Sequence, residues 1–188
     1  MEKILLHSCC APCSAAILEW LANNNYTTTI LFYNPNIFPE EEYLKRKGEI
    51  VRYADSLGIA VVDKDSLEWD VQHTRWKKDI ATLEMEPERG KRCLECFKHR
   101  LCVTAEYAAA NGFDLFTTTL ASSRWKDINQ INEAGRYAEQ IFPGSKFWDK
   151  NWRKGGLYER RNELAKQFYN QQYCGCEYSM RHIETERW

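Results

Sequence analysis

The sequence lacks a membrane-spanning segment and a secretory leader. None of its apolar runs approaches the ~20 residues that a helix needs to cross a bilayer. Residues 1–7 are typical of a strand and lack the charged and apolar regions that form a signal peptide. We therefore expect a protein without membrane association that acts in the cytoplasm.

The chain also lacks a strong net charge, which is −1 over 188 residues. Residues 1–70 carry 6 Lys and Arg against 11 Asp and Glu, whereas residues 71–188 carry 20 against 16. Overall charge therefore does not indicate a nucleic-acid partner, although the second part has enough cations for a basic face. With 44% apolar and 28% charged residues, the composition excludes a disordered or fibrous chain.

Strand and helix patterns alternate along the chain. Apolar and β-branched runs predict strands at residues 3–8, 27–33, 59–63 and 114–119. Helical patterns occupy residues 14–24, 39–58, 66–78, 93–110, 127–140 and 157–170. This alternation predicts an α/β fold, a Rossmann-like and mainly parallel sheet with helices on both faces. We expect one domain over residues 1–188, in which residues 143–188 supply an irregular basic and aromatic stretch, a helix and a tail that packs on the site.

The turn after the first expected strand has no glycine. Ligand sites in parallel sheets lie at the carboxyl ends of the strands, where phosphate-binding turns are rich in glycine. Here the turn carries Cys9, Cys10 and Cys13 instead, which argues against a phosphate-cradling loop. His7 precedes them within an apolar strand, a setting more typical of a hydrogen-bonded buried histidine than of a metal ligand.

Two further cysteine pairs stand later in the chain. Cys93 and Cys96 open a helix, so they share one face, and the helix N-terminus favours thiolates. Cys174 and Cys176 flank one glycine, which lets both thiols meet at one centre or form a readily reduced disulfide. Cys102 lies about 180° around the helix from Cys93, so it is expected in the core.

Seven cysteines in three groups exceed the needs of one structural zinc site, which takes four ligands. Four cysteines would complete a [4Fe–4S] cluster, and three would remain for a second centre or a redox pair. Two alternatives stay open: a structural zinc protein that binds RNA, and a metal-free thiol–disulfide oxidoreductase.

Residues 146–156 interleave aromatic and basic side chains, KFWDKNWRKGG. This composition suits stacking on an unpaired base with contacts to phosphates, and Trp125–Lys126 has the same character. The alternative is that the tryptophans pack in the core and the charges form a solvated rim. The candidate substrate-binding residues are Trp148, Trp152, Arg153 and Lys154.

Several motifs together resemble a known family. They are HSCCAPCS at 7–14, FYNPNI at 32–37, RCLECF at 92–97, GGLYER at 155–160 and YCGCEYS at 173–179. The set resembles the cobalamin-independent, QueH-type epoxyqueuosine reductases, over nearly the whole chain. The resemblance implies an iron–sulfur oxidoreductase with an adenine-nucleotide hydrolase-like fold. Its implied reaction is the last step of queuosine synthesis, reduction of epoxyqueuosine at the wobble position of tRNA, with electrons from a donor that the sequence does not identify.

The resemblance and the spacing lead to one hypothesis for the seven cysteines. Cys9, Cys10, Cys93 and Cys96 would hold the [4Fe–4S] cluster. Cys13, Cys174 and Cys176 would form the reacting part, as ligands of a second iron or with the last two as a redox-active disulfide. Because adjacent side chains usually diverge, one of the first two cysteines could instead join the second centre and a tail cysteine the cluster.

Overall fold

A five-stranded parallel sheet forms the centre of the molecule, in the order β3-β2-β1-β4-β5. The computed structural model describes residues 1–63 and 69–180. The strands are Lys3–Ser8 (β1), Thr27–Phe32 (β2), Val61–Asp63 (β3), Leu115–Thr118 (β4) and Lys146–Phe147 (β5). The expected α/β architecture is therefore confirmed, with the first strand in the middle of the sheet.

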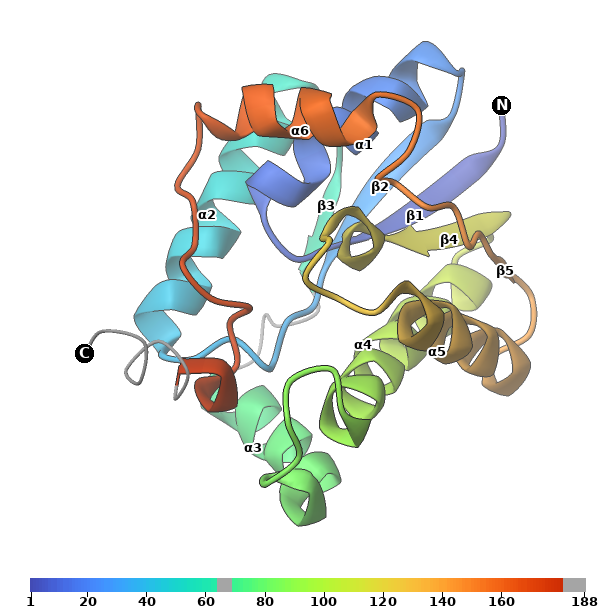
Figure 1. The fold of residues 1–188 in the computed structure, drawn as a ribbon. Coiled ribbons are helices and arrows are strands. Elements are labelled where there is room, and N and C mark those ends of the chain that lie inside the picture. Colours follow the sequence, from blue (N-terminus) through green and yellow to red (C-terminus); the bar gives the residue numbers. More distant parts are fainter. Residues whose placement is uncertain (64–68, 181–188) are drawn as a thin grey trace.

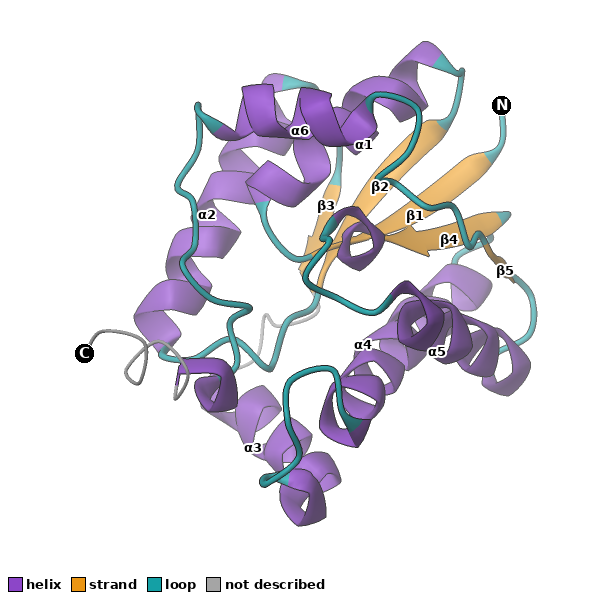
Figure 2. Ribbon diagram, in the orientation of Figure 1, coloured by secondary structure: helices purple, strands orange, loops and turns teal. Residues whose placement is uncertain are grey.

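Helices cover both faces of this sheet, as Figures 1 and 2 show. The described helices are Ala11–Asn23 (α1), Glu40–Ser56 (α2), Trp69–Ile80 (α3), Lys91–Ala110 (α4), Ile128–Ile141 (α5) and Leu157–Ala165 (α6), with short 3-10 turns at Ala81–Leu83 (η1) and Thr119–Ser122 (η2). Of these, α3 packs against α4. Helices α1 and α6 pack together on one face, and α4 packs along α5 on the other. The start predicted for the third helix, at residue 66, lies outside the described residues. None of the described helices has the length and apolar character that a membrane crossing requires.

The central strands of the sheet are buried on both sides, which explains the continuous apolar run of β1. Ile4, Leu5 and Leu6 in β1 have no exposed surface, and neither do Ile30 and Leu31 in β2. Burying each such side chain contributes about 1.5–3 kcal/mol. This core fixes β1, so the turn that follows it has a rigid base.

The fifth strand lies within residues 143–156, where the sequence predicts irregular structure. Lys146 and Phe147 pair with Leu115 and Phe116 at the edge of the sheet. Helix α5 covers this edge closely, since a Cβ on Gly135 would lie 2.3 Å from the Phe147 ring. Two residues are too few for a period-2 pattern, so tertiary contact defines this strand.

Candidate active site

Three thiols converge where β1 ends and α1 begins. The Sγ atoms of Cys9, Cys10 and Cys13 lie within 4.8 Å of one another, and all three residues are buried. We call them the thiol triad. Cys10 is extended and caps the helix, and Pro12 is tolerated in the first turn, so Cys13 returns towards the strand end.

The spacing of the triad suits one metal ion. The Sγ atoms of Cys9 and Cys10 are 3.7 Å apart. In a tetrahedral site with metal–sulfur bonds of about 2.3 Å, two ligand sulfurs lie about 3.8 Å apart. Among the described residues, no other three metal-ligating side chains converge this closely.

Each thiol of the triad has a polar neighbour from a different element. The bonds run from Thr119 Oγ1 to Cys9 Sγ (3.2 Å), from Gln171 Nε2 to Cys10 Sγ (3.1 Å) and from an Arg161 Nη to Cys13 Sγ (3.7 Å). Hydrogen bonds from Cys10 and Cys9, together with Arg161, hold the pKa of Cys13 well below its ordinary value. The partner thiols and burial raise the pKa of Cys10 well above it.

Four further thiols, which we call the thiol tetrad, line one small cavity of about 30 Å³. Cys93 and Cys96 stand in the first two turns of α4, and Cys174 and Cys176 come from the tail. Burial raises the pKa of Cys93 to about 11. A hydrogen bond from Cys176, with help from Lys126, holds the pKa of Cys174 well below its ordinary value. These four cysteines come together only through the tertiary fold.

This grouping differs from the expected division, which joins Cys9 and Cys10 to the pair on α4. The reason is local backbone geometry. The extended residue before α1 and the first helical turn bring Cys13 to its two neighbours, so the three thiols of the turn lie close together. The helix pair faces the tail instead. Cys102 lies outside both groups and is half-buried against the core.

Unpartnered donors line the tetrad cavity. Trp76 Nε1, Arg92 Nε and Arg100 Nε are buried and have no hydrogen-bond partner among the described residues. Buried N–H groups without partners are rare in folded proteins. A lining that combines four thiols with three residues carrying unpartnered donors suits an anionic group whose sulfur atoms accept hydrogen bonds, so the residues present fit an iron–sulfur cluster.

A cleft of about 550 Å³ joins the two thiol groups, since Cys9, Cys13 and Cys174 all line it. Its described lining holds one carboxylate, Glu88, against five cations: Arg46, Arg89, Arg100, Lys126 and Arg161. Burial alone would lower the pKa of Lys126, but the nearby thiols, Cys174 foremost, raise it overall. The cleft therefore presents positive charge to any ligand.

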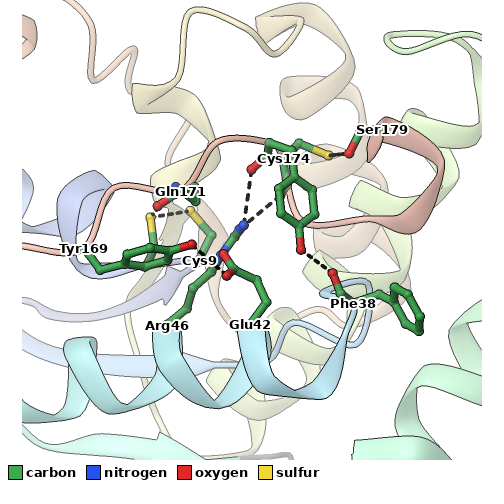
Figure 3. Close-up of polar contacts among 10 residues, drawn as sticks. Cys9, Phe38, Glu42, Arg46, Tyr169, Gln171, Cys174 and Ser179 are labelled. Carbon is green, nitrogen blue, oxygen red and sulfur yellow. Dashed lines mark hydrogen bonds and ion pairs between the residues drawn. The ribbon is translucent and has the colours of Figure 1, made fainter. Parts of the chain in front are cut away.

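Arg46 attaches the tail to α2, as Figure 3 shows. Its guanidinium donates to the carbonyls of Tyr173 and Cys174, at 3.2 Å each, and pairs with Glu42 at 2.7 Å. The Tyr169 hydroxyl donates to the same carboxylate at 2.8 Å. Gly175, at φ 115°, passes so near that a Cβ would lie 2.9 Å from Arg46 Nη1. Two charged side chains of a distant helix thus position the tail cysteines.

His7 is a hydrogen-bonded buried histidine, as expected. It has no exposed surface, and its ring nitrogens contact Thr118 Oγ1 at 2.8 Å and the Tyr33 carbonyl at 3.1 Å. Burial and the nearby Arg100 lower its pKa well below the ordinary value. The side chain therefore joins β1 to its neighbours rather than facing the thiols.

The predicted substrate-binding residues do not gather at the cleft. Trp152 is 1% exposed, within an aromatic cluster that includes Trp148 and Trp20, so its ring is closed to a base. Indoles prefer such packing because it removes their large surface from water. Arg153 is half-buried and donates to the carbonyl of Lys126, whereas Lys154 is exposed.

Two side chains complete the site from other helices without an evident signal in the sequence. Arg46 lies on α2 and Arg161 on α6, far in sequence from any cysteine. The sequence gives little indication that these arginines belong to the site, since isolated arginines on helices are usually solvated. Trp125 is 70% exposed and lines the cleft beside Lys126. The aromatic–basic pairing at 125–126 had indicated this residue in the sequence.

The family model and three curated relatives that match this chain carry the same description. The family model described as "Epoxyqueuosine reductase QueH" matches residues 4–182. A protein of that name from Histophilus somni is 48% identical, over 100% of this chain and 75% of its own length. One from Haemophilus influenzae is 47% identical, over 100% and 74%. One from Thermotoga maritima is 32% identical, over 100% and 97%.

A solved structure with a related fold supports the architecture. It is described as a predicted subunit of a tRNA methyltransferase from Methanocaldococcus jannaschii, with a TM-score of 0.55 and 15% identity. The match covers 100% of this chain and 88% of that one. At this identity the likeness concerns the fold alone, and it agrees with the parallel α/β architecture described above.

Proposed function

The chain belongs to the epoxyqueuosine reductase QueH family and is an oxidoreductase, and from this premise we propose how it reduces epoxyqueuosine in tRNA. The reaction takes two electrons and two protons. Both carbon–oxygen bonds of the epoxide break, the oxygen leaves as water, and a carbon–carbon double bond forms. The observation that carries the proposal is that two thiol groups of different spacing open onto one cationic cleft.

We assign a [4Fe–4S] cluster to the tetrad, Cys93, Cys96, Cys174 and Cys176, and a second iron to the triad. Four thiols and three unpartnered donors suit a cluster, whereas the close spacing of the triad suits one ion. When bound, these groups would supply single electrons and a Lewis acid for the epoxide oxygen.

The chain's own residues position the substrate and the proton. Lys126 lines both cavities between the thiol groups, and it keeps a proton on Nζ because the thiolates around it favour the charged form. That ammonium is our candidate donor to the departing oxygen. Thr119, Gln171 and Arg161 hold the triad thiols in place by donating to them.

The cationic cleft supports tRNA as the substrate. Its five cations offer contacts to phosphates around an unpaired nucleotide. We infer from a tRNA substrate that the enzyme acts in the cytoplasm, where an electron donor would reduce it. The zinc-protein alternative predicts a colourless protein without sulfide, and the metal-free alternative predicts activity that chelators do not affect.

The test is metal analysis of anaerobically purified protein. We expect about five irons and about four sulfides per chain, with a brown absorbance spectrum. Under our assignment, Cys96→Ala and Cys176→Ala abolish that spectrum, whereas Cys10→Ala keeps it and loses one iron. Loss of the cluster in Cys10→Ala would instead support the division first drawn from sequence. Cys102→Ala is the matched control and should keep all metal.

Conversion is then measured on a stem-loop RNA that carries epoxyqueuosine. Mass spectrometry should show loss of one oxygen atom with the loaded wild-type protein. Zinc without sulfide, together with no conversion after iron–sulfur reconstitution, would refute the proposed function.

A further inference from the structure

Trp125 is a large aromatic side chain that the fold leaves in water. It is 70% exposed and stands between η2 and α5. Among the tryptophans of the described residues, Trp125 alone is classed as exposed, while Trp76 and Trp152 are buried. Exposed rings of this size are informative because folding normally covers them.

The indole stands at the cleft rather than elsewhere on the surface. Trp125 lines the cavity of the tetrad and also the larger cleft that joins both thiol groups. Its neighbours in that lining are cations, among them Lys126 and Arg89. An aromatic ring beside several cations is the arrangement by which proteins hold unpaired nucleotides.

The segment that carries Trp125 is fixed by its surroundings. The Arg89 guanidinium donates to the carbonyls of Trp125 at 2.8 Å and of Arg124 at 3.1 Å. The Arg124 guanidinium lies 5.7 Å from the Trp125 ring centroid and 5.3 Å from that of Tyr158. The ring is therefore presented by an ordered turn, which reduces the entropy lost when a ligand stacks on it.

We propose that Trp125 is a stacking platform for an unpaired base of the anticodon loop, and this inference rests on the proposed function. The epoxide must reach the thiols within the cleft, so the base that carries it, or a neighbouring base, lies at the mouth. There the indole meets the flat face of the base, and the surrounding cations meet the phosphates. This role replaces the one predicted for Trp152, whose ring is closed.

The experiment measures binding and turnover separately. Equilibrium binding of an epoxyqueuosine stem-loop is followed by fluorescence anisotropy, and turnover by mass spectrometry. Trp125→Ala should raise both Kd and KM by about 5- to 150-fold, the range for one base–aromatic stack, with kcat changed less than about twofold. Trp125→Phe should restore most of the affinity, whereas Trp125→Leu should not, because leucine has apolar area but no π-face.

The matched control is Tyr137→Ala. Tyr137 is an aromatic side chain on α5 that is 42% exposed and does not line the cleft. Its loss should leave Kd and KM unchanged. Stem-loops with an abasic residue on either side of the modified base identify the stacked base. If the effect of Trp125→Ala disappears in one of them, the neighbour stacks; if it persists in both, the modified guanine stacks.

The outcomes separate this inference from the proposed function. Wild-type protein that binds the stem-loop without converting it would refute the reductase assignment. The ratio of the Kd of Trp125→Ala to that of wild type would still test the stacking role of Trp125. Trp125→Ala binding as tightly as wild type, or Trp125→Leu as tightly as Trp125→Phe, would overturn the stacking role. Absence of RNA binding by wild type would overturn both.

Discussion

Removal of the Arg46 guanidinium should release the tail that carries two of the cysteines. Arg46 is 2% exposed and pairs with Glu42, which is 9% exposed. It also donates to two tail carbonyls. Arg46→Met keeps much of the side-chain volume but removes the charge and all of these bonds.

The expected loss follows from the carboxylate that remains. Removing one partner of a buried ion pair costs about 3–5 kcal/mol, because the other charge stays buried without compensation. The bond from Tyr169 to Glu42 persists and limits the loss. We expect Arg46→Met to lower the free energy of unfolding by about 3–4 kcal/mol. Glu42→Gln in the same chain should recover part of this, since the amide carries no charge.

The control is Arg52→Met on the same helix. Arg52 pairs with Glu49, but its side chain is 62% exposed, so its loss should cost less than about 1 kcal/mol. Urea unfolding of the metal-free proteins measures both variants. With a slope of about 2 kcal/mol/M, Arg46→Met should lower the midpoint by roughly 1.5–2 M. Equal midpoints for the two variants would refute the claim that this buried pair holds the tail.

Two more predictions concern packing and pH. Gly135→Ala places a Cβ 2.3 Å from the Phe147 ring and should cost about 1–3 kcal/mol in thermal unfolding, whereas Gly48→Ala, in open space within α2, should gain about 0.5–1 kcal/mol. A destabilised Gly48→Ala or a neutral Gly135→Ala would contradict this difference. Burial lowers the pKa of His99, although Asp79 opposes the shift. The unfolded chain therefore binds more protons below about pH 6.5, and stability should fall there by up to about 1.4 kcal/mol per pH unit. His99→Gln should flatten that slope in urea titrations between pH 5 and 7, and an unchanged slope would assign it to other groups.

The sequence by itself determined the sheet and the centre of the site. The run at residues 3–8 is apolar and bounded by a cysteine turn, so it predicts a buried strand, and β1 has these bounds. Local patterns of this kind carry the information because a strand buried on both faces must be apolar throughout. The same logic placed the cysteines of the first turn at a carboxyl end of the sheet.

Tertiary structure decided the rest. β5 exists because two residues complete the edge beside β4 under α5. Cys9, Cys10 and Cys13 lie close together because Cys13 curls back at the helix start, whereas Cys174 and Cys176 line one cavity with Cys93 and Cys96 because the tail reaches α4. The spacing of the cysteines in the sequence predicts neither arrangement. Trp152 and Trp125 look alike in sequence, yet packing buries one and leaves the other at the cleft. Long-range packing of this kind depends on which surfaces meet, and only the folded chain brings them together.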